Sequence, residues 1–307
     1  MILTVDIGNT NITFGVFKDN DLLFESRMET NRSRLRDQYA IELRDILDLY
    51  GVNPRKLEGS IICSVVPPLT DCFAGAIELL TGKYPLIIGP GIKTGLNIRI
   101  DNPAQLGADL VAGAVAAIAM VKSPSIIFDL GTATTISVIG KDNSFLGGCI
   151  MPGAGISLDT LTVRTAQLPQ INMEAPPKVI GKNTIHCMQS GSVYGTASMI
   201  DGMIDRIEEE LGEKATVITT GGLANMISQY CKRDVVPVSY THLDVYKRQM
   251  QVLSVQSASN GMAVNGKALD YLYSKAKECG AEIVMYYNDA VSYTHLDVYK
   301  RQVSISF

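Results

Sequence analysis

The sequence predicts an α/β protein that consists of two duplicated domains, each with a mixed β-sheet flanked by helices. One segment occurs twice, as T-V-D-I-G-N-T-N from Thr4 and as I-F-D-L-G-T-A-T from Ile127. Each copy reads as an apolar strand, an Asp-x-Gly turn, a β-rich strand and a polar K-D-N turn that leads to another apolar strand. The chain has 307 residues, which suffices for two domains with sizeable cores.

The first half of the chain has the element order of one half of a mixed-sheet α/β fold. Residues 1–30 form a strand meander, and residues 36–50 carry apolar side chains at helical spacing up to Gly51. The pattern then predicts a strand at 60–66 ended by two prolines, a helix at 70–80, a strand at 85–88, and a helix at 104–121 that leads into the second half.

The second half repeats the meander over residues 126–150. A Gly- and Pro-rich M-P-G-A-G-I-S segment and a helical stretch at 157–169 follow. The long helix expected at 184–211 carries small residues on one side that allow close packing, either internally or across a dimer. These small residues are Gly191, Gly195 and Gly202. A strand at 215–219 then runs into T-G-G-L-A.

Composition excludes several classes of protein. The net charge is −4 and no basic run occurs, which argues against a nucleic-acid-binding surface. The N-terminus M-I-L-T-V-D lacks a cationic leader and a cleavage site, so we expect no signal peptide. The longest apolar stretch, Leu110 to Val121, is too short to span a bilayer and reads as a buried helix, so we expect no membrane association.

Cysteine and histidine usage narrows the chemistry further. The six cysteines show no C-x-x-C spacing and no paired framework, which predicts reduced, core-facing thiols in a cytoplasmic protein. Of the three histidines, only His186 lies outside a repeated segment near the C-terminus. A Ser-His-Asp hydrolase or a His-rich metal site is therefore not expected, and acid–base chemistry should fall to carboxylates.

The residue types of the repeated turn suit a nucleotide phosphate chain and a metal ion in a cleft between the halves. Gly8 and Gly131 let backbone N–H groups approach phosphate oxygens without a Cβ in the way. Asp6 and Asp129 are carboxylates at apolar strand ends and need a cation, a hydrogen-bond network or water. Side-chain donors that suit phosphate are Asn9, Thr10 and Asn11 in the first turn, and Thr132, Thr134 and Thr135 in the second. For a single copy, the alternative is a plain tight turn.

Other glycine-rich segments carry weaker information. Gly221 and Gly222 stand where a strand opens into a helix, which suits either the close approach of a base or ribose or an ordinary β-to-α turn. No phosphate-binding loop of the Walker type occurs, because G-P-G-I-K-T has Ile92 at the second glycine position. G-A-G-I-S-L from Gly153 fails the dinucleotide fingerprint at its third glycine position.

A series of short motifs follows in order between Met1 and about Asp234. The motifs are D-I-G-N-T-N at Asp6, D-N-P-A-Q-L-G-A-D at Asp101, D-L-G-T-A-T-T at Asp129, G-G-x-I-x-P-G at Gly147, T-A-x-L-P at Thr165, I-G-K-N-T at Ile180 and S-G-x-V-Y-G at Ser190. This series resembles the type III pantothenate kinases of the acetate-and-sugar-kinase/Hsp70/actin superfamily.

The resemblance implies two actin-like (ribonuclease H-like) domains with ATP between them. It implies ATP-dependent phosphorylation of pantothenate to 4'-phosphopantothenate, the first step of coenzyme A biosynthesis. It also implies a homodimer and dependence on Mg²⁺ and on a monovalent cation, K⁺ or NH₄⁺.

The resemblance further implies roles for individual residues. Asp6 would face the metal–phosphate cluster and so contact Mg²⁺ indirectly, Asp129 would bind the monovalent cation, and Asp109 would be the general base. The implied ATP-binding residues are Asp6, Gly8, Asn9, Thr10, Asn11 and Thr132, joined by the glycine pair Gly221 and Gly222. The implied pantothenate site comprises Gly107, Ala108, Asp109, Leu110 and Thr184, the last from either subunit of the dimer.

The implied reaction needs little base strength, because an alcohol attacks the γ-phosphorus in line through a loose transition state. Asp109 would orient the hydroxyl group and accept its proton, while Mg²⁺ and backbone N–H groups offset phosphate charge. Plainer roles stay open: a solvated or capped helix carboxylate for Asp109, a supporting structural carboxylate for Asp129, and a helix N-cap for Thr184. Two positions depart from the usual pattern, Leu110 for arginine and Ile100 for tyrosine, and Leu110 removes a charged contact to the substrate carboxylate.

The C-terminal part of the chain carries no family motif. V-S-Y-T-H-L-D-V-Y-K-R-Q occurs at 238–249 and again, unchanged, at 291–302. Identical copies without surface divergence are typical of a translated adapter joined to unrelated sequence, and a genuine peptide-binding tail is the alternative. We therefore assign 1–115 and 116–236 to the two domains, the second incomplete because no closing strand and helix are found, and 237–307 to a foreign tail.

Two other functions compete with the pantothenate kinase. One is a non-catalytic regulatory protein on the same scaffold, of the kind described as accessory factors for virulence gene transcription. Such a protein has no need of all three carboxylates Asp6, Asp109 and Asp129. The other is a kinase for a sugar or for acetate, which the G-A-D and I-G-K-N-T motifs disfavour.

Overall fold

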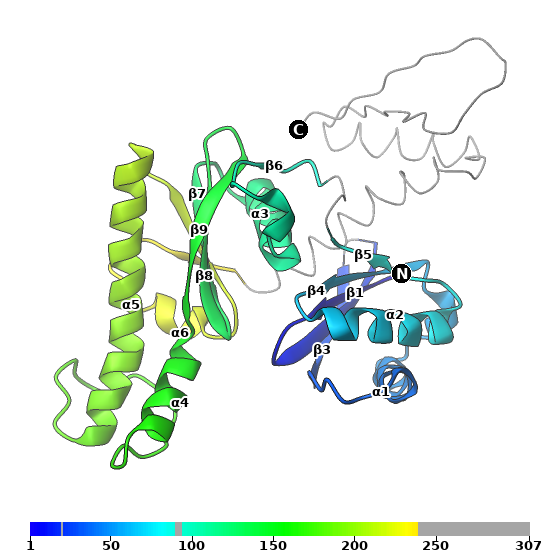
Figure 1. The fold of residues 1–307 in the computed structure, drawn as a ribbon, viewed down its shortest axis with the longest axis horizontal. Helices are drawn as coiled ribbons and strands as arrows, with labels where there is room; N and C mark the ends of the chain where they lie inside the picture. The colour runs from blue at the N-terminus through cyan, green and yellow to red at the C-terminus, as the bar shows by residue number, and fades with distance from the viewer. Residues whose placement is uncertain (20, 90–93, 239–307) are drawn as a thin grey trace, which may run out of the picture. The chain divides into compact units, whose positions relative to one another are not determined.

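The computed structural model describes residues 1–19, 21–89 and 94–238, which build two mixed β-sheets with helices on their faces (Figure 1). The first sheet has the strand order β3-β2-β1-β4-β5, from β1 (Ile2–Ile7), β2 (Asn11–Lys18), β3 (Asp21–Glu29), β4 (Gly59–Ser64) and β5 (Leu86–Ile87). The second has the order β11-β10-β7-β8-β9-β6, from β6 (Asn97–Ile98), β7 (Ser125–Leu130), β8 (Ala133–Ile139), β9 (Ser144–Pro152), β10 (Thr216–Thr220) and β11 (Val236–Pro237).

The two sheets repeat one topology. β1 and β7 each pair antiparallel with the next strand of the chain and parallel with a later strand, β4 and β10 respectively. In these ladders Asp6 stands opposite Thr13, and Asp129 stands opposite Thr135. The predicted duplication is confirmed by this pairing, which puts the two Asp-x-Gly turns at the same end of equivalent central strands.

The helices of the described residues are α1 (Arg36–Leu49), α2 (Pro67–Thr81), α3 (Ala108–Met120), α4 (Ala154–Arg164), α5 (Thr184–Leu211) and α6 (Ala224–Ser228), with short 3-10 turns at Pro54–Lys56 and Pro103–Gln105. α1 and α2 pack on the first sheet in one apolar core, and α5 and α6 pack on the second sheet in another (Figure 1). The meanders and the long helix were predicted at these positions.

Some predicted element ends were wrong for identifiable reasons. α2 begins at Pro67 rather than at residue 70, because proline suits the first turn of a helix, where its missing N–H needs no partner. α3 begins at Ala108 rather than at residue 104, because Pro103–Gln105 turn separately. On α1 the buried face is narrower than the apolar pattern predicted, since Ile41 and Leu49 are 53% and 78% exposed.

Helix α3 packs against both sheets, and its alanine-rich sequence explains why. Ala112 and Ala116 lie in a cluster with Phe17, Ile61 and Cys63 of the first sheet. A second cluster joins α3 to the second sheet, and its buried members are Ala114, Ala117, Ile127, Ile139, Phe145 and Ile218. Small side chains on two sides of one helix allow this double packing, which confirms the predicted buried helix. Within the described residues, no helix has the length and apolar character needed to cross a membrane.

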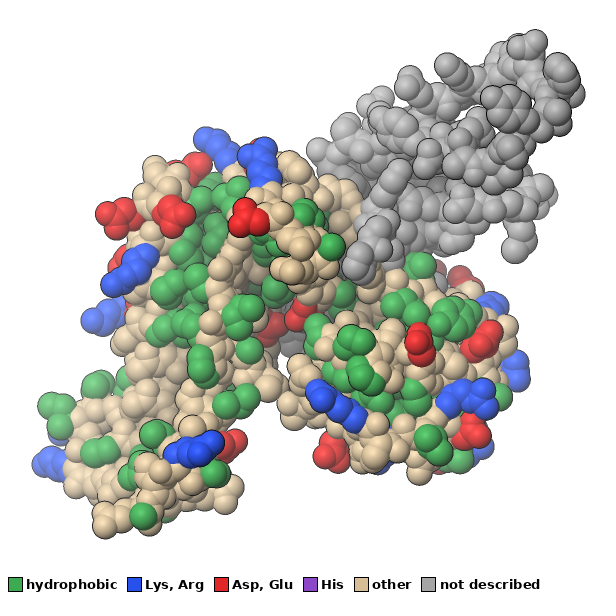
Figure 2. Space-filling model, in the orientation of Figure 1, with side chains coloured by type: hydrophobic (Ala, Val, Ile, Leu, Met, Phe, Trp, Pro, Cys, Tyr) green, Lys and Arg blue, Asp and Glu red, His purple; other side chains and the backbone are tan. Residues whose placement is uncertain are grey.

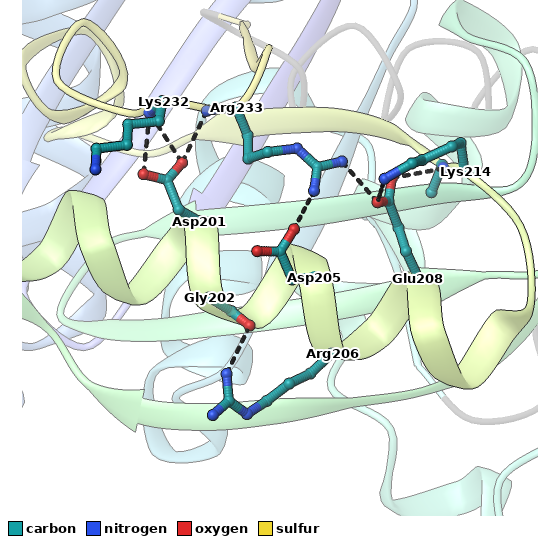
Figure 3. Close-up of polar contacts among 9 residues, drawn as sticks. Asp201, Gly202, Asp205, Arg206, Glu208, Lys214, Lys232 and Arg233 are labelled. Carbon is teal, nitrogen blue, oxygen red and sulfur yellow. Dashed lines mark hydrogen bonds and ion pairs between the residues drawn. The ribbon is translucent and has the colours of Figure 1, made fainter.

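The end of the described chain is fastened to α5 by charged groups (Figure 3). The Asp201 carboxylate accepts hydrogen bonds from the backbone N–H groups of Lys232 and Arg233, at 2.9 to 3.0 Å. The Arg233 guanidinium donates to Asp205 and, at 2.6 Å, to Glu208, whose side chain is only 6% exposed.

Strand β11 follows this anchored segment and pairs parallel with β10, with Ile218 opposite Val236. This short strand was not predicted, and the incompleteness of the second domain stays a prediction. A two-residue strand has no periodicity of its own and is defined only by the neighbour it pairs with.

No disulfide joins the cysteines of the described residues, and these side chains are not uniformly core-facing. Cys63 is buried, whereas Cys187 is exposed in the first turns of α5. Burial, and to a lesser extent Asp201, raises the pKa of Cys231 to about 11. Asn20, Ile92, Cys279 and the repeated segments at 239–249 and 291–302 lie outside the described residues. The predicted domain boundaries stay predictions, and the first of them falls within α3.

Candidate functional site

The first Asp-x-Gly turn joins β1 to β2 and is closed by its own backbone. The Gly8 N–H donates to the Asn11 carbonyl at 3.0 Å, and a Cβ on Gly8 would lie 3.1 Å from that oxygen. Asp6 is half-buried at the strand end, whereas Asn9, Thr10 and Asn11 are exposed. The turn therefore presents side-chain donors to solvent beside one carboxylate, as the sequence predicted.

The second turn joins β7 to β8 and has the same form. The Gly131 N–H donates to the Ala133 carbonyl at 3.2 Å, and Thr132 is exposed. Thr134 does not add a donor here, because it is only 2% exposed and lines a groove next to α4 and α5. Side chains alternate across a strand, so the expectation for Thr134 as a phosphate donor was wrong.

The two turns meet each other. The hydroxyl groups of Thr10 and Thr132 lie 2.9 Å apart and share a hydrogen bond. Residues far apart in the sequence but equivalent in the duplicated fold are thus brought into one exposed cluster. The cluster combines two glycine turns, hydroxyl and amide donors, and the carboxylates of Asp6 and Asp129.

Two further glycine segments pack on the second turn. A Cβ on Gly221 would lie 2.6 Å from Oδ1 of Asp129, and the φ of +92° at Gly221 also disfavours any other residue. A Cβ on Gly153, at the end of β9, would lie 2.4 Å from the carbonyl oxygens of Gly131 and Thr132. The backbone of T-G-G thus comes close to Asp129, whereas a Cβ on Gly222 would meet open space.

The residues at this turn fit a hard cation. Asp129 supplies a half-buried carboxylate, and Gly221 next to its Oδ1 brings no Cβ to that oxygen. No three His, Cys, Asp or Glu side chains of residues 1–19, 21–89 and 94–238 gather into a metal-binding group. Mg²⁺ in nucleotide sites needs only one or two protein carboxylates, because phosphates and water supply its other ligands.

Asp109 lies in the first turn of α3, the helix that contacts both sheets. Its Oδ1 lies so close to Gly107 that a Cβ on that glycine would be 2.4 Å away. Gly107 precedes the helix with an extended backbone, and its carbonyl accepts from Val111 N–H at 3.1 Å. Gly107, the glycine of G-A-D, therefore leaves room for the Asp109 carboxylate. This explains physically why a glycine stands two residues before the aspartate.

The two positions that depart from the family pattern share one environment. Leu110 and Ile100 both pack against the apolar cluster that joins α3 to the second sheet. Both side chains are half-buried there. Each adds apolar contact area where the usual residues, arginine and tyrosine, carry polar groups.

Thr184 is the first residue of α5 and does not cap it. The N-cap is Asn183, whose Oδ1 accepts from the backbone N–H of His186 at 2.8 Å. The alternative role of Thr184 as an N-cap was therefore wrong, and its exposed side chain is available for other contacts. Thr184 begins α5, the helix that contacts α4, whereas Ala108, Asp109 and Leu110 begin α3.

A groove of about 560 Å³ lies next to this end of α5. Gly191 and Gly195 line it, and a Cβ on either would meet nothing within 4 Å. Internal close packing is therefore not the role of these two glycines. Exposed apolar side chains lie nearby on α4 and α5, and hydrophobic surface is visible over the ends of these helices in Figure 2; Ile156, Leu161, Val163 and Ile185 are such residues.

Sequence reasoning missed two parts of the site. Gly153 was noted only as part of a glycine-rich segment, although its motif G-G-x-I-x-P-G was the available signal. Arg32 was not singled out, yet its Nη2 donates to Oδ1 of Asn9 at 2.9 Å. An isolated arginine in a loop carries no spacing signal, and pairing of β2 with β3 alone brings it to the turn.

Comparison with known proteins gives a consistent family. A family model described as "Type III pantothenate kinase" matches residues 2–206. A type III pantothenate kinase of Moorella thermoacetica is 42% identical over 227 residues, which are 74% of this chain and 89% of that protein. A type III pantothenate kinase of Roseiflexus sp. is 45% identical over 228 residues, with the same coverage.

Solved structures with little sequence identity share the fold. A conserved putative Baf family transcriptional activator from Campylobacter jejuni has a TM-score of 0.54 at 18% identity, covering 82% of this chain and 98% of that one. A putative 2-dehydro-3-deoxygalactonokinase from Sinorhizobium meliloti has a TM-score of 0.50 at 12% identity, covering 82% and 99%. These likenesses concern the fold alone and confirm the predicted actin-like α/β class.

Proposed function

The chain belongs to the type III pantothenate kinase family, and we propose that its paired Asp-x-Gly turns hold ATP while Asp109 activates pantothenate. The reaction is ATP-dependent phosphorylation of pantothenate to 4'-phosphopantothenate, the first step of coenzyme A biosynthesis. The observation that carries the site assignment is the meeting of the two turns at Thr10 and Thr132, beside Asp129 and Gly221.

The phosphates of ATP lie between the two turns in this proposal. Asn9, Thr10, Asn11 and Thr132 supply side-chain donors to the phosphates. Gly8 and Gly131 keep the turns free of Cβ atoms, while their own N–H groups close the turns onto the Asn11 and Ala133 carbonyls. The hydroxyl groups of Thr10 and Thr132 bond each other in this structure, and each is also a suitable hydrogen-bond donor to a phosphate oxygen. Gly222, which has open space beside it, lets the base or ribose approach the backbone.

Asp6 and Asp129 supply oxygen ligands for cations. Bound Mg²⁺ would neutralise phosphate charge, and bound K⁺ or NH₄⁺ would offset the Asp129 carboxylate. In this proposal Asp6 faces the metal through water or phosphate, and Asp129 holds the monovalent cation. The half-buried positions of both carboxylates at strand ends support these roles.

Asp109 is the proposed general base. Its carboxylate orients the primary hydroxyl group of pantothenate and accepts the hydroxyl proton. The hydroxyl oxygen forms a bond to the γ-phosphorus, the bond from that phosphorus to the bridging oxygen of ADP breaks, and ADP leaves with the electron pair. A loose transition state needs only modest base strength, so a carboxylate suffices.

Pantothenate lies along Gly107, Ala108, Asp109 and Leu110 in this proposal, with Thr184 contributed by the partner in a homodimer. Thr184 is exposed on α5, a helix that shares no apolar cluster with α3 among the described residues, and this supports a contribution from the partner. The unfilled glycine groove beside it supports a second copy packing there. Because Leu110 brings no charge, the substrate carboxylate must find its donors elsewhere.

A non-catalytic regulatory role is not favoured. The relatives with substantial identity are pantothenate kinases, and the likeness to a putative transcriptional activator concerns the fold only. The retained Asp6, Asp109 and Asp129 also favour an enzyme. The free thiols of the described residues agree with the proposed cytoplasmic location.

A panel of phosphate acceptors tests this function. The intact chain is incubated with ATP, Mg²⁺ and K⁺, and with pantothenate, glucose or acetate in turn. We expect equal amounts of ADP and phosphopantothenate, identified by mass, with pantothenate alone. Turnover of glucose or acetate without pantothenate turnover would contradict the assignment.

A further inference from the structure

A loop after β3 is bonded directly to the first Asp-x-Gly turn. The Thr30 N–H donates to the Thr10 carbonyl at 3.0 Å, and the Thr30 hydroxyl donates to the Gly8 carbonyl at 2.7 Å. Two residues later, Nη2 of Arg32 donates to Oδ1 of Asn9 at 2.9 Å. Thr30 therefore holds the backbone of the turn, while Arg32 reaches one of its exposed side chains.

The bond from Arg32 determines how the Asn9 amide is turned. A guanidinium group only donates hydrogen bonds, so the Asn9 atom that faces it must be the acceptor oxygen. The amide nitrogen of Asn9 then points away from Arg32, with both of its N–H donors unengaged by that contact. Without Arg32, either end of the amide could face the turn.

We propose that Arg32 is a positioning residue for nucleotide binding, which acts by presenting the Asn9 amide donors to a phosphate oxygen of ATP. The inference rests on the proposed function, since it names a further residue of the same ATP site. Arg32 is exposed, as is Asn9. Its contact is a charge-assisted hydrogen bond, the stronger class of such bonds.

The effect of Arg32 should appear in nucleotide binding and depend on Asn9. We expect Arg32→Met to raise the dissociation constant and the KM for ATP about tenfold, the scale of one charge-assisted hydrogen bond. The KM for pantothenate should not change. Arg32→Lys, which keeps a cationic donor, should recover part of the affinity.

A double-mutant cycle separates action through Asn9 from other roles. ATP binding to the intact chain is measured by calorimetry with Mg²⁺ for the parent, Arg32→Met, Asn9→Ala and the double variant. We expect Arg32→Met to add almost nothing once Asn9 is alanine. Arg44→Met is the matched control, because Arg44 is exposed on α1 and pairs with its neighbour Asp45.

The outcomes distinguish the inference from the function it rests on. Losses that multiply in the double variant, or an Arg32→Met variant that binds ATP like the parent, would overturn the positioning role. A parent that binds ATP but does not phosphorylate pantothenate would overturn the proposed function alone. A folded parent that does not bind ATP would overturn both.

Discussion

Gly107 precedes α3 with a φ of −59° and a ψ of 141°, a conformation open to any residue. It nevertheless has no room for a methyl group, because a Cβ there would lie 2.4 Å from Oδ1 of Asp109. A displacement of about 1 Å in a reacting group can cost roughly a hundredfold in rate. We therefore expect Gly107→Ala to fold like the parent but to lower kcat by about 10- to 100-fold, measured as pantothenate-dependent ADP release.

The matched control is Gly155→Ala on α4, where an added Cβ would meet nothing within 4 Å. That variant should keep the parent kcat. If Gly107→Ala also kept it, the position of the Asp109 carboxylate would not matter for the reaction.

At the residue scale, the sequence predicted the features that depend on residue type and on spacing along the chain. The paired turns at Asp6 and Asp129 were found because both copies are present in the chain. The cap of α5 was not, because Asn183 and Thr184 are both good capping types and only the bond to His186 distinguishes them. Arg32 was missed because strand pairing, not sequence distance, brings it to Asn9.

At the scale of elements, the fastening of α5 to the chain end gives a pH-dependent stability. Burial by itself raises the pKa of Glu208, but hydrogen bonds from Lys214 and Arg233 outweigh it and lower the pKa from 4.5 to about 2. A depressed carboxyl pKa stabilises the fold above the ordinary pKa, and this stabilisation is lost as the pH falls from about 4.5 towards 2. We expect Glu208→Gln to lower the free energy of unfolding by about 2 kcal/mol at pH 7.

Urea unfolding at pH 7 and at pH 3 checks this expectation. The difference between the parent and Glu208→Gln should shrink at pH 3, because Glu208 is protonated there in the unfolded chain and still ionised in the native one. Glu209→Gln, an exposed neighbour on the same helix, should match the parent at both values of pH. A Glu208→Gln penalty that did not change with pH would show that the ion pairs are not its source.

The elements that could be predicted are those with a period of their own. α5 was predicted over its whole length, 184–211, and it ends at Gly212 with a φ of +72°, a glycine conformation typical of helix C-termini. β6 and β11 were not predicted, because each has two residues and exists only through pairing with β9 or β10. The buried face of α1 was predicted to be wider than it is, because the spacing of apolar residues does not reveal which helical turns the core covers.

At the scale of the whole molecule, the glycine groove gives a test of assembly. We expect the parent to sediment as a dimer and Gly195→Glu to sediment as a monomer, because the new side chain would fill the groove with a charge. The isolated chain accommodates the change, since a Cβ there meets nothing within 4 Å. Ser198→Glu, exposed on the same helix but outside the groove lining, should remain a dimer. A monomeric parent would refute the dimer proposal.

The foreign-tail hypothesis is tested by a chain that ends at Val238. The pairing of β11 with β10 and the anchoring of Lys232 and Arg233 fasten the described end of the chain. We expect this shortened chain to keep its thermal midpoint to within about 4 °C, the shift that roughly 1 kcal/mol would cause in a domain of this size. Aggregation of the shortened chain would mean that residues after 238 complete the fold.

The duplication was the most predictable property of the molecule, because strands in both halves carry the same pattern and pair in the same order. The contact of Thr10 with Thr132 was less predictable, because the repeated pattern identifies both turns but does not give the distance between them. The double packing of α3 depends likewise on two sheets at once.

The central claim is that this chain transfers phosphate from ATP to pantothenate with Asp109 as the base. It is tested most directly by comparing pantothenate-dependent ADP release by the intact chain and by Asp109→Asn, at equal amounts of folded protein with Mg²⁺ and K⁺. We predict turnover by the parent and a loss of about 10²- to 10⁴-fold in kcat for the variant, the usual contribution of a general base. Equal turnover by the two proteins, or none by a folded parent that binds ATP, would contradict the claim.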